Sequence, residues 1–125
     1  MNLSEAVRQM LINAGLERAY IIDCPDDGSA VLVTPYMSRA YDGVPVGEQR
    51  FQIYCAAGTF PESEALAWRA FHALEDKAPP ACDREVLGLV RALQEPFFLD
   101  KDPQGRYIHE FNIAVSAVWK ENENV

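Results

Sequence analysis

Residues 95–118 read EPFFLDKDPQGRYIHEFNIAVSAV and include one of the longest alternating runs in the chain. The segment 102–105 has the composition of a tight turn, because Pro103 presets φ and Gly105 tolerates positive φ. Beyond it one side of the run carries Tyr107, Phe111, Ile113, Val115, Ala117 and Trp119, and the other carries Glu110, Asn112 and Ser116. A period of two predicts a strand with one dry face. A strand from Arg106 to Trp119 would be about 45 Å long, more than a small core needs.

Two other segments have the apolar spacing of helices. The first is predicted over 3–14, with Asn2 and Glu5 as a capping box, Ser4 as the alternative cap and Gly15 as the C-terminal stop. The second begins at Pro61, a residue suited to the first helical position, and ends before the Ala-Pro-Pro-Ala sequence at 78–81. Its apolar stripe consists of Leu66, Ala67, Ala70, Phe71 and Leu74.

Shorter strands are predicted at Tyr20–Ile22, Ala30–Thr34 and Gln49–Ala57. Residues 35–47 show no period and are expected to form a loop rich in adhesive side chains. Residues 83–94 are ambiguous: the spacing of their apolar residues favours a helix, but Gly88 would cost that helix ~1 kcal/mol. We therefore predict one α+β domain over 1–125, with a mostly antiparallel, possibly mixed sheet of about five strands and two helices on one face.

The composition narrows the function classes. The net charge is −8, from 11 Lys and Arg against 19 Asp and Glu, and no cationic cluster is present, so tight binding to DNA or RNA is not expected. There is no apolar run of membrane-spanning length and no signal-peptide pattern, so we expect no membrane association. Cys24, Cys55 and Cys82 lack ligand or disulfide spacing and are interpreted as free thiols.

Catalytic and metal-site patterns are weak. Residues 100–105 begin like a calcium loop, but position 12 is Phe111 instead of a glutamate, so a solvated turn is the better interpretation. The carboxylates at 23, 26 and 27 are interpreted as turn residues. His72 and His109 belong to no nucleophile motif, and His109, on the apolar side of its strand, is interpreted as a satisfied core group. We expect no enzyme activity, metal or cofactor.

Tyrosine and arginine outside the predicted core are candidates for protein contacts, because both are enriched at interface hot spots. The alternative is that they are ordinary half-exposed sheet and loop residues. With the Asp of the turn, the interface candidates are Tyr36, Tyr41, Arg50, Tyr54, Asp102 and Arg106.

Three blocks of sequence resemble the bacteriophage minor capsid protein family, of the tail terminator or tail completion type. The first is FQIY at 51–54 with SEALAWRAFHAL at 63–74; the second is EPFFL at 95–99; the third is KDPQGR at 101–106 with FNIAV at 111–115. They lie within residues 49–118, and the N-terminal third matches only in outline. Cys55 and Ala56 depart from the more polar strand end that such proteins have.

The resemblance implies a phage or prophage structural protein that forms a ring, typically of six copies, on the tail tube and joins it to the head connector. It implies a homo-oligomer with tail-tube and connector partners, through which DNA passes without being gripped, in the virion after assembly in the bacterial cytoplasm. It also implies that residues 83–94 form a strand, and this interpretation is preferred to the helix. In that ring the long strand at 106–119 and the sheet edges would join neighbours, with the loop at 35–47 as a second contact. The alternative function is a small non-catalytic adaptor domain.

Overall fold

The computed structural model describes residues 1–118, which fold into two helices and one mixed sheet. The elements are α1 (Leu3–Asn13), β1 (Ala19–Ile21), β2 (Ala30–Ala40), β3 (Val46–Ala57), α2 (Phe60–Leu74), β4 (Arg91–Ala92), β5 (Phe97–Lys101) and β6 (Tyr107–Val118). Over these residues the strand order is β1-β2-β3-β6-β4, and β5 also pairs with β6. The β1–β2 pair is parallel and the other pairs are antiparallel. The predicted α+β class is confirmed.

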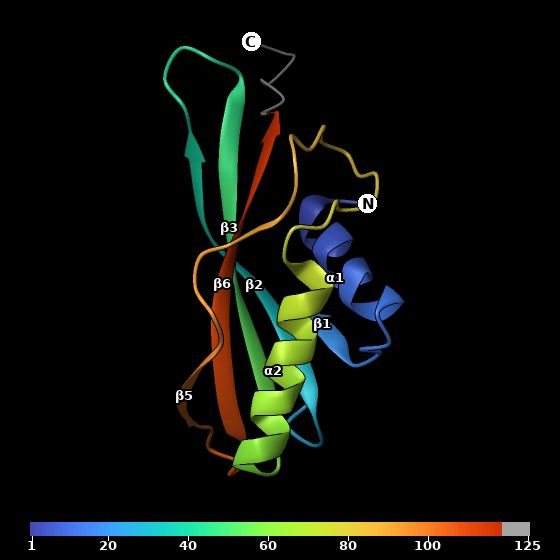
Figure 1. Ribbon diagram of the computed structural model, residues 1–125, viewed down its shortest axis with the longest axis vertical. Coiled ribbons are helices and arrows are strands. Elements are labelled where there is room, and N and C mark those ends of the chain that lie inside the picture. The colour runs from blue at the N-terminus through green and yellow to red at the C-terminus, as the bar shows by residue number, and fades with distance from the viewer. Residues whose placement is uncertain (119–125) are drawn as a thin grey trace.

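Both helices begin at polar caps. The Asn2 side chain accepts a hydrogen bond from the Glu5 backbone and the Glu5 carboxylate accepts one from the Asn2 backbone, which is the predicted capping box. Thr59 caps α2, which begins at Phe60, one residue before the predicted start at Pro61. The two helices lie on the same face of the sheet (Figure 1).

The core lies between the helices and the alternate residues of three long strands. Phe71 of α2 packs edge-on against Phe111 of β6, with ring centroids 5.5 Å apart. The predicted dry face of β6 is confirmed, because its odd-numbered residues from 109 to 117 are buried. Trp119, the last residue of the predicted strand, lies outside the described residues. From the sheet the core receives Val31, Val33, Phe51, Ile53, Cys55, Phe111, Ile113 and Val115.

The prediction of a loop at 35–47 is wrong. β2 continues to Ala40 and β3 begins at Val46, so most of this stretch is a β-hairpin with a bulge between Pro35 and Met37. The sequence of these strands shows no period of two because all residues from 36 to 45 are exposed. A strand without a buried face needs no alternation of apolar residues. Pro35 is tolerated beside the bulge and beyond the last β1 pair, where a proline removes no ladder hydrogen bond.

Residues 83–94 form neither the helix that their spacing favours nor the continuous strand that the resemblance implies. Strand pairing is limited to Arg91–Ala92 and an isolated bridge between Val86 and Ala117. Gly88 lies between them with φ +84°, which interrupts both a helix and a strand. The segment nevertheless runs along β6 as an irregular flank.

That flank changes the role expected of β6. Within residues 1–118, β6 has β3 on one side and residues from 85 to 101 on the other. The expectation that this long strand itself offers a sheet edge to a neighbour is therefore wrong. The upper part of β2 is different: on the side away from β3, β1 pairs with it only as far as Val33, and no described strand lies on that side from Pro35 onward.

Candidate interaction surfaces

The hairpin at residues 35–50, hereafter the arm, projects past the ends of both helices (Figure 1). Its turn is closed by the Tyr41 backbone N–H, which donates to the Val46 carbonyl at 2.9 Å. Apolar side chains remain exposed along it, with 47% of Met37 and 51% of Val44 accessible. Since none of them joins the core, the arm carries an adhesive surface that the fold does not use.

An ionic network fixes the base of the arm. Glu48 is buried, and its two carboxylate oxygens accept hydrogen bonds from Arg50 and from Arg91 of β4. The Arg50 Nε to Glu48 Oε2 distance is 3.2 Å, and the hydrogen bond and charge of Glu48 raise the pKa of Arg50. Arg50, predicted as a contact residue, is thus engaged within the subunit, whereas Tyr36 and Tyr41 are exposed on the arm.

The turn at 102–105 is held by its flanking charges. Asp102 Oδ1 accepts from the backbones of Gln104 and Arg106, and Arg106 Nε donates to Asp102 Oδ2 at 2.7 Å. Arg106 Nη1 also donates to the carbonyls of Pro25 and Gly28. Burial would raise the pKa of Asp102, but the hydrogen bonds from Arg106 lower it overall. Asp102 and Arg106 therefore tie two loops together.

A hollow of about 420 Å³ lies beside this turn, on the sheet face opposite the helices. Leu32, Tyr54 and Ile108 form part of its lining, and Arg106 stands at its edge. The Tyr54 hydroxyl donates to Gln52 at 2.8 Å, and burial, with the neighbouring charge of Glu110, raises the pKa of Tyr54. The six predicted contact residues thus divide into two groups: Tyr36, Tyr41 and Arg50 on the arm, and Tyr54, Asp102 and Arg106 around the hollow.

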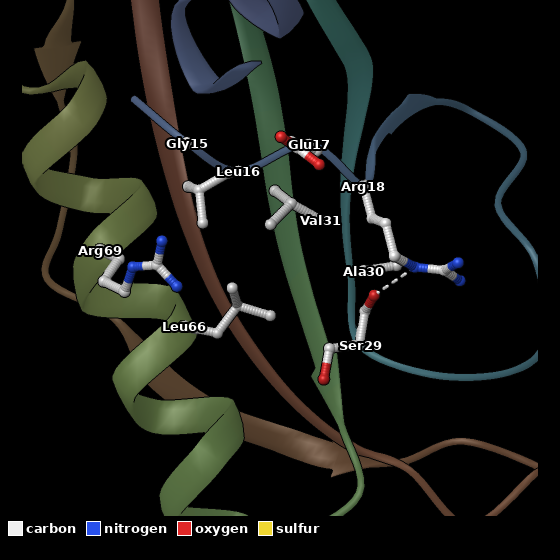
Figure 2. A pocket seen from close by; sticks show the side chains of 9 residues that line it. All are labelled: Gly15, Leu16, Glu17, Arg18, Ser29, Ala30, Val31, Leu66 and Arg69. Carbon is white, nitrogen blue, oxygen red and sulfur yellow. Dashed lines mark hydrogen bonds between the residues drawn. The ribbon is translucent and has the colours of Figure 1, made fainter. Parts of the chain in front are cut away.

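A smaller hollow of about 260 Å³ lies between α2, the loop after α1 and the start of β2. Figure 2 shows Leu16, Val31 and Leu66 forming its apolar floor, with Arg69 reaching over it. Arg18 turns away and donates to the Ser29 carbonyl at 2.8 Å. Glu17 and Ser29 also line this hollow, but no histidine, cysteine or lysine lies among its lining residues.

An exposed aromatic patch lies at the end of the sheet remote from the arm. Phe60, at the start of α2, packs against Phe98 of β5 with ring centroids 5.2 Å apart. All five residues of β5 are exposed, and about 40% of Phe97, Phe98 and Leu99 remains accessible. Residues 97–99 belong to one of the three blocks that carry the family resemblance, but their exposure was not predicted from the sequence. Consecutive apolar side chains on an exposed edge strand are typical of a contact surface.

A buried Ser–His pair lies beneath this patch. Ser63 Oγ is 2.8 Å from His109 Nδ1 and donates to the Cys55 carbonyl at 2.9 Å. Because the single hydroxyl proton is directed to a carbonyl, His109 Nδ1–H must be the donor to Ser63. Burial lowers the pKa of His109, and only 2% of the residue is exposed. The prediction that His109 is a satisfied core group is confirmed; the partner was missed because it lies 46 residues away.

Residues 1–118 contain no group of three His, Cys, Asp or Glu side chains arranged to hold a metal ion. No helix among them has both the length and the apolar character needed to cross a membrane. The three cysteines are free thiols, as predicted.

Comparison with known proteins supplies the family. A family model described as bacteriophage tail terminator protein matches residues 9–119. Among solved structures, a chain from the virion of a native gene transfer agent particle matches with a TM-score of 0.74 at 16% identity, over 94% of this chain and 95% of that one. At this identity the second match shows a shared fold. No curated protein matches the chain.

Proposed function

We propose, because the chain belongs to the bacteriophage tail terminator protein family, that it forms a closed ring on the end of a tail tube and joins that tube to the head connector. The family identifies it as a structural protein of a phage-type virion. In our proposal the ring stops tube polymerisation and then presents a docking face to the connector. Assembly takes place in the bacterial cytoplasm, and the finished ring remains in the virion.

The observation that supports this most strongly is the arm. Residues 36–45 are all exposed, although they include two tyrosines, a methionine, a valine and a proline. A monomer gains nothing in its core from a hairpin that no helix covers. A subunit that contacts neighbours is stabilised in the assembly by such a hairpin, because the same side chains become buried there.

Two partners require two faces. The arm lies at one end of the sheet, and the patch around Phe60 and Phe98 lies at the other (Figure 1). We assign the patch and the adjoining hollow around Tyr54 to docking against another virion protein, either the tube or the connector. Apolar patches separated by the length of the sheet suit a protein that joins two different structures.

The acidic balance fits a ring through which DNA moves. A charge of −8 on each subunit repels phosphates and gives no cationic surface on which DNA would be held. The chemistry of the buried pair also fits an assembly role, because the Ser63 proton is directed to the Cys55 carbonyl. We therefore propose that the protein acts through assembly and not through catalysis.

Tube growth in the presence of the protein tests this proposal. Tail-tube protein from the same phage is polymerised with and without the chain, and tube lengths are measured by electron microscopy. Wild type should shorten the tubes and appear at their ends. Tyr54→Ala and Arg106→Ala variants that stay folded should cap less well; if both cap normally, the hollow is not a docking surface. Unchanged tube lengths with wild type would contradict the proposed function.

A further inference from the structure

The level of each residue along the strands follows from the sheet register. Arg39 of β2 is paired with Glu48 of β3, which is paired with Ser116 of β6. The Ser116 carbonyl accepts a hydrogen bond of 2.8 Å from the Leu87 backbone. Arg39 and Leu87 therefore lie at the same level on opposite flanks of the sheet. The Glu85 carbonyl accepts a hydrogen bond from the Val118 backbone, and Val118 is paired with Val46. Glu85 therefore lies level with the start of β3.

The β2 flank has an unpaired backbone at this level. The Tyr41 N–H is directed inward to Val46, and in an antiparallel pair inward and outward groups alternate. The backbone groups of Ser38 and Ala40 consequently point away from β3, on the side where no described strand lies. Exposed strand edges of this kind are sites for contact with another chain.

The opposite flank, residues 85–89, hereafter the ridge, has matching side chains. Leu87 and Leu89 are 38% and 53% exposed, and on the arm Tyr36 and Met37 are 39% and 47% exposed. Each flank therefore carries an apolar pair that the subunit leaves uncovered.

The charges are also complementary. Arg39 on the arm and Glu85 on the ridge are both exposed, and neither side chain has a hydrogen-bond or ion-pair partner among residues 1–118. A cation on one flank and an anion on the other, each beside apolar residues, suit a head-to-tail contact between identical chains.

We propose that the outer edge of the β2 arm of one subunit packs against the ridge of the next, with Arg39 level with Leu87 and its long side chain reaching two residues along the ridge to Glu85. This inference rests on the proposed ring. Copies related by a rotation axis parallel to the strands meet at equal levels, so a contact between flanks at equal levels closes without a rise. Such a rotation leaves strand directions unchanged. β2 and β6 are both antiparallel to β3 and therefore run the same way, and the ridge is antiparallel to β6. The β2 strand of one subunit and the ridge of the next therefore run in opposite directions.

Charge reversal tests the contact. In Arg39→Glu the arm and ridge are both acidic, and in Glu85→Arg both are basic, so each variant alone should need a roughly tenfold higher concentration to assemble. A 1:1 mixture should recover, because alternating subunits place opposite charges at every contact. The recovered rings should contain an even number of subunits. Native mass is measured for wild type, each variant and the mixture, with tube ends supplied if wild type needs them.

Arg69→Glu and Glu64→Arg are matched controls, since they make the same charge changes at exposed positions on α2. They should assemble like wild type, and circular dichroism should show all four variants folded. Normal rings from both flank variants, or no recovery in the mixture, would overturn this pairing and leave the ring in place. Wild type that forms no ring, alone or on tubes, would overturn the ring itself and this contact with it.

Discussion

The two halves of the β2–β3 pair are made by the same two strands, but one half is covered by the helices and the other is exposed. In the lower half, Val31 and Val33 are paired with Cys55 and Ile53, and all four side chains belong to the core beneath the helices. In the upper half, the arm, residues from 36 to 45 are exposed. The lower half needs its side chains to fold, whereas the arm has apolar side chains that folding does not use. In our proposal the covered half provides stability and the arm provides contacts for assembly.

The largest effect is expected from Phe111→Ala in the covered half. Phe111 is fully buried against Phe71, and removing its ring leaves a cavity that should lower the free energy of unfolding by about 3–5 kcal/mol. Urea denaturation followed by circular dichroism measures this loss. A loss below about 1 kcal/mol would show that this half is not the core of the fold.

A smaller loss is expected from Ser63→Ala, which removes the one hydroxyl that His109 and the Cys55 carbonyl share. The His109 Nδ1–H and the Cys55 carbonyl would remain buried without that hydrogen bond, at a cost of about 1–3 kcal/mol. Ser38→Ala on the exposed arm is the matched control and should change stability by less than about 0.5 kcal/mol. Equal effects of the two substitutions, again in urea, would remove the distinction between the halves.

His109 should also make stability depend on pH. Because burial lowers its pKa in the folded protein, the unfolded chain takes up the proton first as pH falls below about 6.5. Stability is therefore complete above about pH 6.5 and decreases as the pH approaches the folded pKa. Unfolding midpoints between pH 7.5 and 5 should fall more for wild type than for His109→Gln.

His72→Gln, which replaces the exposed histidine of α2, is the matched control substitution. Burial raises the pKa of Glu110, so protonation of this carboxylate at lower pH favours the folded protein and opposes the effect of His109. Wild type and both variants all contain Glu110, so the difference between their slopes reports on the histidines. A His109→Gln variant with the full wild-type slope would show that His109 is not the titrating group.

The smallest change in stability is expected on the arm. Tyr41→Ala and Met37→Ser remove exposed side chains and should alter the free energy of unfolding by less than about 0.5 kcal/mol. The same variants should weaken self-assembly, measured as the shift in native mass with concentration. Variants that unfold the protein, or that assemble like wild type, would each contradict the role given to the arm.

The sequence predicted those parts of the fold that have one dry face. The stripe of α1 and the alternation in β6 each reflect contact with a single core, so their periods are visible in the chain. The arm was missed because its strands are exposed on both faces and leave no period. Residues 83–94 were missed because their apolar residues pack or project individually around Gly88.

The candidate surfaces were predicted only by residue type. Tyrosine and arginine chemistry led to both regions, but it could not show that Arg50, Asp102 and Arg106 are engaged by neighbours within the subunit. Nor could it show that Phe60 and Phe98 meet on the surface, because the contact joins α2 to β5 across the fold. Such pairings depend on tertiary register, which a single sequence does not contain.

Native mass measured across concentration, for wild type and Tyr41→Ala side by side, tests the central claim most directly. The account predicts a closed ring of defined subunit number for wild type, alone or on supplied tube ends, and a folded but smaller species for the variant. Wild type that stays monomeric and leaves tube ends unbound, or a Tyr41→Ala chain that forms the same ring with the same concentration dependence, would contradict it.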